Sequence, residues 1–218
     1  MIKEAVACNI DIVAVFVRCD YEYTDSIDVR ESYVLNKNLF ANIAQTETSQ
    51  GIVAIVKRKE YTEKEFFGLC EDGNVLVLDR LQDPGNIGTM IRTAEAAGYK
   101  GIVAIKGTGD IFSPKTVRAA AGSIFRMPVL FVDTPAQTLA IMRSFNKRII
   151  STCFETEINY FDVDLKNNIA LIIGNEGAGI SKELIAEADL KIKIPMNTQV
   201  NSLNAAVAAG ILMYESRR

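Results

Sequence analysis

One short stretch of this 218-residue chain places a carboxylate inside a glycine-rich turn. Glu176 follows Gly174 and Asn175 and precedes Gly177, directly after the apolar run 169–173. Glycine lets a backbone approach a ligand closely, and many nucleotide-binding proteins have such a turn between a strand and a helix. A carboxylate here would repel phosphates. The turn therefore favours a cationic or hydroxyl-bearing ligand over a pyrophosphate, although an ordinary tight turn explains the glycines equally well.

The chain contains no histidine and four scattered cysteines, Cys8, Cys19, Cys70 and Cys153. The absence of histidine excludes histidine general bases, Ser-His triads and the commonest zinc ligand. Because no CxxC pair is present, reduced and mostly buried thiols are a better interpretation than a disulfide framework or a zinc site. We therefore expect no metal site.

Two further groups of polar residues precede and follow the glycine turn. Upstream, residues 78–94 read Leu-Asp-Arg-Leu-Gln-Asp-Pro-Gly-Asn-Ile-Gly-Thr-Met-Ile-Arg-Thr-Ala and contain Asn86 and Arg92. Downstream, Ile-Pro-Met at 194–196 is followed by Ser-Leu-Asn at 202–204. With the turn between them, these motifs closely resemble, in order and spacing, the three signatures of the SpoU (TrmH-type) RNA ribose 2′-O-methyltransferases of the SPOUT superfamily.

The resemblance covers about Asn74 to Arg218. It implies transfer of a methyl group from S-adenosylmethionine to a ribose 2′-hydroxyl of ribosomal or transfer RNA, with S-adenosylhomocysteine as the product. Because the sulfonium already makes the methyl electrophilic and the hydroxyl is a very weak acid, much of the catalysis would be positioning and desolvation. The resemblance also implies RNA and a second copy of the chain, in a homodimer, as partners.

The resemblance implies a catalytic set of Arg92, Asn86, Glu176, Ser202 and Asn204. Since an arginine stays protonated at any ordinary pH, we interpret Arg92 as holding the target phosphate and stabilising alkoxide charge rather than as a general base. Ordinary structural alternatives are a solvated arginine, helix caps for Asn86 and Ser202, and an acceptor of backbone N–H groups for Glu176. Asn204 falls inside a predicted Ala-rich helix, where propensity does not explain it, and this favours a functional role.

The positions that match the family's donor pocket would contact S-adenosylmethionine largely through backbone groups. They are Gly174, Asn175, Gly177, Ile194, Met196 and Leu203, with Thr152 at the end of its strand as a further candidate. The chain departs from the family pattern at Thr198, where a glycine is common, and at Ala205-Ala206-Val207, where Val-Ser-Val is common. We expect donor binding to survive these changes, with altered loop geometry and efficiency.

The elements that must position these residues alternate between strand and helix. From residue 74 onward this alternation predicts an α/β fold with a mostly parallel sheet and helices on both faces. Ligands of such sheets lie outside the carboxyl ends of the strands, where Asn86, Thr152 and the glycine turn all fall. Ser202 is expected to cap a last helix, Leu203 to Glu215. The resemblance alone adds a C-terminal trefoil knot, which simple topology rules would not predict.

Residues 1–70 are expected to form a separate small α/β domain, and residues 71–218 the knotted methyltransferase domain. The first domain resembles the ribosomal-protein-like, RNA substrate-binding domain of the family, including Ser-Gln-Gly-Ile-Val-Ala at 49–54, but looks shortened by about a helix and a strand. Residues 61–72 are expected to be a linker with a short helix. Up to Asp72 the chain carries 8 basic and 13 acidic residues, a balance that disfavours phosphate contacts.

The composition describes a soluble globular protein without a membrane segment or a signal peptide, so we expect a cytoplasmic location. A net charge of −3 gives no general attraction for nucleic acid, and RNA binding would depend on local basic patches. The leading interpretation is an S-adenosylmethionine-dependent RNA 2′-O-methyltransferase. The alternative is a non-catalytic RNA-binding relative that retains the donor pocket. A generic nucleotide-dependent enzyme is disfavoured, because neither GxGxxG nor a P-loop is present.

Overall fold

The computed structural model describes residues 1–22, 29–44, 49–197, 199 and 202–218. The chain divides into two compact units, Met1–Lys59 and Glu60–Arg218. The division lies earlier than the boundary expected after residue 70, because α3 (Glu63–Cys70) buries Phe66 and Phe67 in a core cluster of the second unit. The segment expected to be a linker therefore belongs to the second unit.

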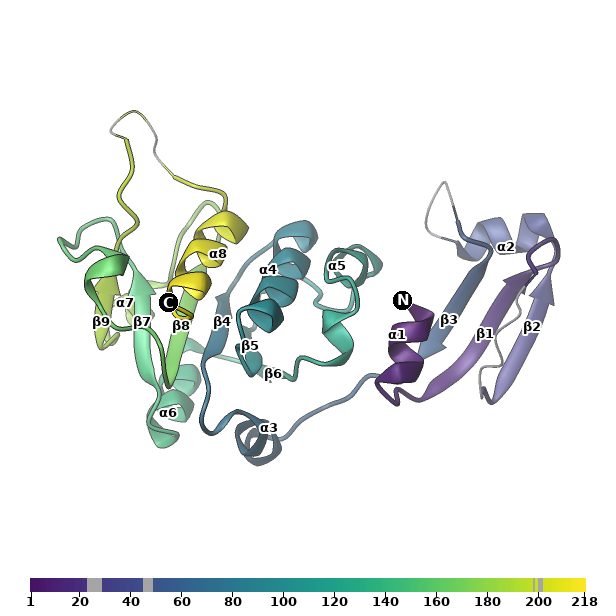
Figure 1. Cartoon of the computed structure of the whole chain (residues 1–218), viewed down its shortest axis with the longest axis horizontal. Coiled ribbons are helices and arrows are strands. Elements are labelled where there is room, and N and C mark those ends of the chain that lie inside the picture. The colour runs from purple at the N-terminus through teal and green to yellow at the C-terminus, as the bar shows by residue number, and fades with distance from the viewer. Residues whose placement is uncertain (23–28, 45–48, 198, 200–201) are drawn as a thin grey trace. The chain divides into compact units, whose positions relative to one another are not determined.

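The first unit is a three-stranded sheet with two helices (Figure 1). Its elements are α1 (Ile2–Ala7), β1 (Ile12–Arg18), β2 (Glu31–Leu35), α2 (Lys37–Ile43) and β3 (Ile52–Val56). The strand order is β2-β1-β3, with β1 parallel to β2 and antiparallel to β3. The sequence pattern does not predict β2, because this edge strand is exposed along nearly its whole length and shows no alternation of burial.

The second unit is built around a six-stranded sheet. After α3 its elements are β4 (Val75–Asp79), α4 (Pro84–Ala96), β5 (Gly101–Ile105), α5 (Pro114–Ala119), η1 (Ser123–Phe125), β6 (Val129–Val132), α6 (Pro135–Ser144), β7 (Arg148–Thr152), η2 (Tyr160–Asp162), β8 (Ile169–Gly174), α7 (Lys182–Ala186), β9 (Leu190–Ile192) and α8 (Ala205–Glu215). The strand order is β6-β5-β4-β8-β7-β9, and every pairing is parallel. The predicted parallel sheet is confirmed.

Helices cover both faces of this sheet, as predicted (Figure 1). Leu76 and Leu78 of β4 belong to one buried cluster, together with residues of α4 and α8. Val75 and Val77 belong to the other cluster, together with residues of α3, α6 and α7. Successive side chains of a strand point to opposite faces, so a strand covered on both sides is apolar at every position.

The strand order changes direction at β4, which lies between β5 and β8. After β4 the chain builds β5 and β6 on one side and later places β7, β8 and β9 on the other. The register puts Asp79 beside Gly174, so the carboxyl ends of β4 and β8 are level. Open parallel sheets bind ligands at such a reversal point.

Lys147 is a buried side chain at the opposite, amino-terminal end of the strands, and only 3% of it is exposed. Its Nζ donates to the carbonyl oxygens of Cys70, Glu71 and Gly73 at 2.7, 2.8 and 2.7 Å and to Asn168 Oδ1 at 2.7 Å. The last carbonyls of a helix have no partner inside the helix. Lys147 supplies donors at the end of α3 and ties that helix to the starts of β7 and β8.

Replacing Lys147 by methionine is expected to lower the free energy of unfolding by about 2–4 kcal/mol, because buried carbonyl oxygens lose their donor. Lys64→Met, on the exposed side of α3, should change it by less than about 0.5 kcal/mol. Urea unfolding followed by circular dichroism measures both. Equal unfolding midpoints for the two variants would contradict the role given to Lys147.

Candidate functional site

The start of α4 lies beside the carboxyl end of β4 and carries the first predicted site residue, Asn86. The helix begins with Pro84, whose missing N–H and fixed φ suit a first helical position. Asp83 is the N-cap, and its Oδ1 accepts from the Asn86 N–H at 2.8 Å. The cap considered for Asn86 is therefore supplied by Asp83, which leaves the Asn86 side chain for other contacts.

The carboxylate of Glu176 joins the turn after β8 to the start of α4. Oε2 accepts from the Gln82 N–H at 3.1 Å, and Oε1 accepts from the Asp83 N–H at 3.2 Å and from Asn86 Nδ2 at 3.1 Å. Backbone N–H groups at a helix start have no partner inside the helix and favour an anion. The structural role considered for Glu176 is confirmed, and its partners lie on a distant part of the chain.

Hydrogen bonds at the start of α4 favour the anionic form of two carboxyl groups, those of Glu176 and Asp83. Partial burial would raise the pKa of Glu176, but hydrogen bonds from Asn86 and from backbone N–H groups outweigh it, so the pKa lies below its ordinary value. The backbone N–H of Asn86 lowers the pKa of Asp83 in the same way. Both carboxylates are therefore anionic at neutral pH; that of Asp83 lies 3.7 Å from Lys115 Nζ, whereas that of Glu176 is bonded to uncharged groups.

Asn86 also links Glu176 to the last helix. Its Oδ1 accepts from Asn204 Nδ2 at 3.0 Å. The Oδ1 of Asn204 in turn accepts from the N–H groups of Ala206 and Val207 at 2.9 and 3.2 Å and so caps α8. A continuous chain of side-chain hydrogen bonds therefore runs from the turn after β8, through α4, to α8.

The structure corrects the expected start of the last helix. The helix begins at Ala205 rather than at Leu203, and Asn204, not Ser202, is its N-cap. Asparagine caps helices as well as serine does, and its carbonyl oxygen reaches two amide groups here. The argument that Asn204 lies inside the helix without a structural reason is therefore wrong. Ser202 lies exposed before the helix.

Arg92 lies on the same helix as Asn86 but outside the Glu176 network. The two residues are six positions apart, which places their side chains about 120° apart around a helix. Arg92 is exposed, whereas Asn86 is half-buried. Within the described residues its guanidinium makes no hydrogen bond or ion pair, so it is available to an anionic ligand.

The residues predicted to line the donor pocket lie on loops at one edge of the sheet. Thr152 ends β7; Gly174 ends β8, with Asn175 and Gly177 in the following turn; Ile194 and Met196 follow β9; and Leu203 precedes α8. Because β8, β7 and β9 are neighbours, these strand ends share the same edge. Ile194 packs partly against the core, whereas Leu203 is 36% exposed. The departure at Thr198 lies outside the described residues.

The glycines of the turn differ in whether the structure would tolerate a side chain at their positions. A Cβ on Gly174 would lie 2.3 Å from the Ile180 nitrogen, so the turn that folds back on the strand end already requires a glycine here. Gly179 has a φ of +69°, which glycine adopts freely. A Cβ on Gly177 would have ordinary space, 3.7 Å from Asn175 Oδ1. The expected contact of Gly174 with the donor stays a prediction.

Three further residues of the upstream signature, 78–94, lie at the carboxyl edge of the sheet, and the sequence analysis did not single them out. Asp79 is fully buried at the end of β4, and Arg80 pairs with it. Gln82 Nε2 donates to the Arg80 carbonyl oxygen at 3.1 Å and also to the Gly107 carbonyl oxygen. The signal in the sequence is an aspartate that ends an otherwise apolar strand, where an unpaired charge would be costly.

The described residues meet the requirements of neither a metal site nor a membrane-spanning helix. In the described ranges, no group of three or more His, Cys, Asp or Glu residues is arranged to hold a metal ion. None of the helices formed by those residues combines the length and apolar character needed to cross a membrane.

Comparisons with known proteins relate this chain to RNA methyltransferases. The family model of the SpoU rRNA Methylase family matches residues 73–214. The 23S rRNA (guanosine(2553)-2′-O)-methyltransferase RlmP of Bacillus subtilis is 39% identical over 187 residues, which are 86% of this chain and 73% of the relative. An AdoMet-bound rRNA methyltransferase from Sinorhizobium meliloti has a TM-score of 0.87 at 30% identity, covering 99% of this chain and 83% of that one. The AviRb methyltransferase of Streptomyces viridochromogenes, in complex with AdoMet, has a TM-score of 0.87 at 26% identity, covering 99% and 85%.

Glu176→Gln is expected to destabilise the protein at neutral pH and to lose this effect on acidification. Because the pKa of Glu176 is lowered by folding, its contribution is present above the ordinary glutamate pKa of about 4.3 and disappears as the pH falls through the lowered value. Urea unfolding of the wild type and the variant between about pH 3 and pH 7 measures the difference. Glu183→Gln, on α7, serves as the control. A Glu176→Gln effect of constant size across this range would contradict the assignment.

Proposed function

Because this chain belongs to the SpoU rRNA methylase family, we propose that it transfers a methyl group from S-adenosylmethionine to a ribose 2′-hydroxyl of RNA. The observation that carries the proposal is the hydrogen-bonded network of Asn86, Glu176 and Asn204, one residue from each family motif, at the ends of β4 and β8. The name of the Bacillus relative supports ribosomal RNA 2′-O-methylation, and the Sinorhizobium structure supports the donor.

The donor would bind on the loops after β7, β8 and β9. Its adenosine would contact Ile194 and Leu203 as apolar surface and backbone groups near Gly177, where the turn leaves space. The anionic Glu176 makes this edge suitable for a positively charged ligand, and the same charge disfavours a pyrophosphate. When bound, S-adenosylmethionine supplies an electrophilic methyl group. Thr152, at the end of β7, would lie between the turn after β8 and the loop after β9.

The RNA would be held on the α4 side of the donor. Arg92, which is protonated at any ordinary pH, would bind a phosphate of the target nucleotide and stabilise negative charge developing on the 2′-oxygen. Asn86 and Asn204 each use one amide N–H in the network, so each retains a second N–H for the ribose. Ser202, exposed beside them, adds a hydroxyl group. The proton of the 2′-hydroxyl would leave to phosphate or water.

Two further features come from the resemblance to the family. We propose that the segment after β8 is threaded into a trefoil knot, and that the unit Met1–Lys59 is a ribosomal-protein-like domain that helps to hold the RNA substrate. A cytoplasmic location would follow from such a substrate.

Arg92→Ala is expected to lower methyl transfer at least about 100-fold, because a group that stabilises developing charge is lost. The dissociation constant for S-adenosylhomocysteine should change less than about twofold, because Arg92 faces the RNA. Labelled methyl transfer to total RNA and titration calorimetry measure the two quantities. Arg148→Ala, at the amino-terminal end of β7, should retain activity. If the wild type binds the donor yet methylates no RNA, the alternative of a non-catalytic RNA-binding relative replaces the enzyme.

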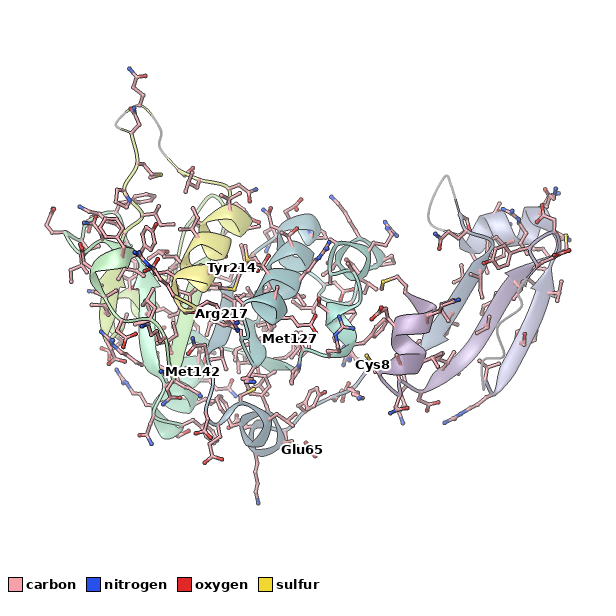
Figure 2. The ribbon with its side chains drawn as sticks, in the orientation of Figure 1. Cys8, Glu65, Met127, Met142, Tyr214 and Arg217 are labelled. Atoms are coloured by element: carbon pink, nitrogen blue, oxygen red, sulfur yellow. The ribbon has the colours of Figure 1, made fainter. Side chains whose placement is uncertain are left out.

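We infer that the protein forms a homodimer through α8. This helix is apolar on all sides, and such helices are usually buried on all sides. Ala209 and Leu212 face the core, but Val207 and Tyr214 are 52% and 54% exposed. Figure 2 labels Tyr214 on this helix. η2, which contacts α8, adds Phe161, which is 49% exposed, and a second copy would cover these exposed apolar side chains.

Val207→Glu is expected to convert the dimer into a monomer, because a carboxylate would be buried without a partner at the interface. Val34→Glu places the same substitution at an exposed position of the first unit and should leave the dimer intact. Sedimentation velocity distinguishes the two states. A wild type that sediments as a monomer at concentrations of about 10 μM would contradict this interface.

A further inference from the structure

Asp79 and Arg80, at the end of β4, form an ion pair through two parallel contacts. Arg80 Nε donates to Asp79 Oδ1 at 2.8 Å, and Arg80 Nη2 donates to Asp79 Oδ2 at 3.2 Å. The Asp79 side chain is 0% exposed, whereas that of Arg80 is 39% exposed. A two-point contact of this kind fixes orientation as well as charge, because both groups are planar. The pair therefore places a guanidinium at a defined position on the carboxyl edge of the sheet.

The backbone of Arg80 is in the left-handed region, with a φ of 59°. Residues with a long side chain rarely adopt this conformation, which glycine and asparagine adopt more easily. The Arg80 N–H donates to Thr108 Oγ1 at 3.1 Å, and the same hydroxyl donates to the Leu78 carbonyl oxygen at 3.1 Å. A strained residue beside a ligand site suggests a functional reason for its side chain.

The pair holds the Asn175–Gly179 turn at both ends. Asn175 Nδ2 donates to the Arg80 carbonyl oxygen at 2.8 Å, and Arg80 Nη2 reaches the Gly179 carbonyl oxygen at 3.4 Å. The N–H of Ser181, just beyond the turn, donates to Asp79 Oδ2 at 2.6 Å. The side chain of Ser181 makes no capping bond, so Asp79 supplies the acceptor where α7 starts.

We propose that Asp79 and Arg80 are the positioning residues of the donor site. They set the turn that carries Glu176 and Gly177, and through it the affinity for S-adenosylmethionine. Asp79 is too deeply buried to touch a ligand, so it acts through Arg80 and Ser181. This inference rests on the proposed function, because it assumes that the donor binds against this turn.

The main competitor is a direct contact between the exposed part of Arg80 and an RNA phosphate. A direct contact would weaken RNA binding and leave donor binding unchanged. A positioning role would weaken donor binding and leave RNA binding unchanged, because the turn is displaced while Arg92, which lies outside the Glu176 network, stays in place to hold the RNA phosphate. Donor affinity and the KM for RNA therefore separate the two roles.

The variant Arg80→Asn removes the guanidinium but tolerates the left-handed backbone. We expect it to weaken S-adenosylhomocysteine binding about tenfold in titration calorimetry on the full chain. Arg80→Lys, which keeps the charge but loses the two-point contact, should lie between Arg80→Asn and wild type. At saturating donor, the KM for RNA should stay within about twofold of wild type, whereas kcat should fall, because the displaced turn carries Glu176, which orients Asn86. Asp79→Asn should weaken S-adenosylhomocysteine binding at least as much as Arg80→Asn does. If this buried variant fails to fold, Arg80→Asn still tests the proposal.

Arg126→Asn is the matched control, because Arg126 is 40% exposed and pairs with Glu95 away from the turn. Its donor affinity should equal that of the wild type. A raised KM for RNA with unchanged donor affinity in Arg80→Asn would overturn the proposal, and so would a loss of affinity no larger than that of Arg126→Asn. A wild type that binds no S-adenosylhomocysteine would instead overturn the proposed function itself.

Discussion

The hydrogen bonds between the Glu176 carboxylate and the start of α4 are the interaction on which the rest of the site depends. Gln82 and Asp83 present backbone N–H groups that the helix cannot satisfy, and the carboxylate satisfies them from the turn after the neighbouring strand β8. The same carboxylate fixes the amide of Asn86, which then fixes Asn204 at the start of α8. One charged group therefore connects side chains of three segments at the carboxyl edge of the sheet, and charge-assisted hydrogen bonds are among the stronger ones in proteins.

The two ends of the parallel sheet have different tasks. At the amino-terminal ends of the strands, Lys147 is surrounded by acceptors and serves stability. At the carboxyl ends, polar side chains such as Asn86 are only half-buried and retain hydrogen-bonding groups for a ligand. Helices cover both faces, so the strand ends are the part of the sheet where loops can gather around a bound molecule.

The sheet and its helices were predictable because strands covered on both sides are continuously apolar, as in 169–173, and because Pro84 marks a helix start. The edge strand β2 was not predictable, since its exposed residues carry no burial pattern. The strand-end rule and the family motifs correctly placed Asn86, Glu176 and Asn204 near one another. They could not show which residue caps α8, because serine and asparagine are equivalent by type. The roles of Asp79 and Arg80 depend on contacts with distant parts of the chain, which no local pattern reports.

The bonds of Asn86 join residues that are 90 and 118 positions apart. On a ribosome that adds roughly 5–20 residues per second, α4 would wait about 6–24 s before the residues that cap α8 are made. Contacts between residues so distant in sequence also form slowly during folding, because the chain must lose loop-closure entropy before the contact stabilises it. The network would therefore be absent from any nascent chain that ends before residue 204. In the proposed enzyme, Asn86, Glu176 and Asn204 can therefore act together only after residue 204 has been synthesised.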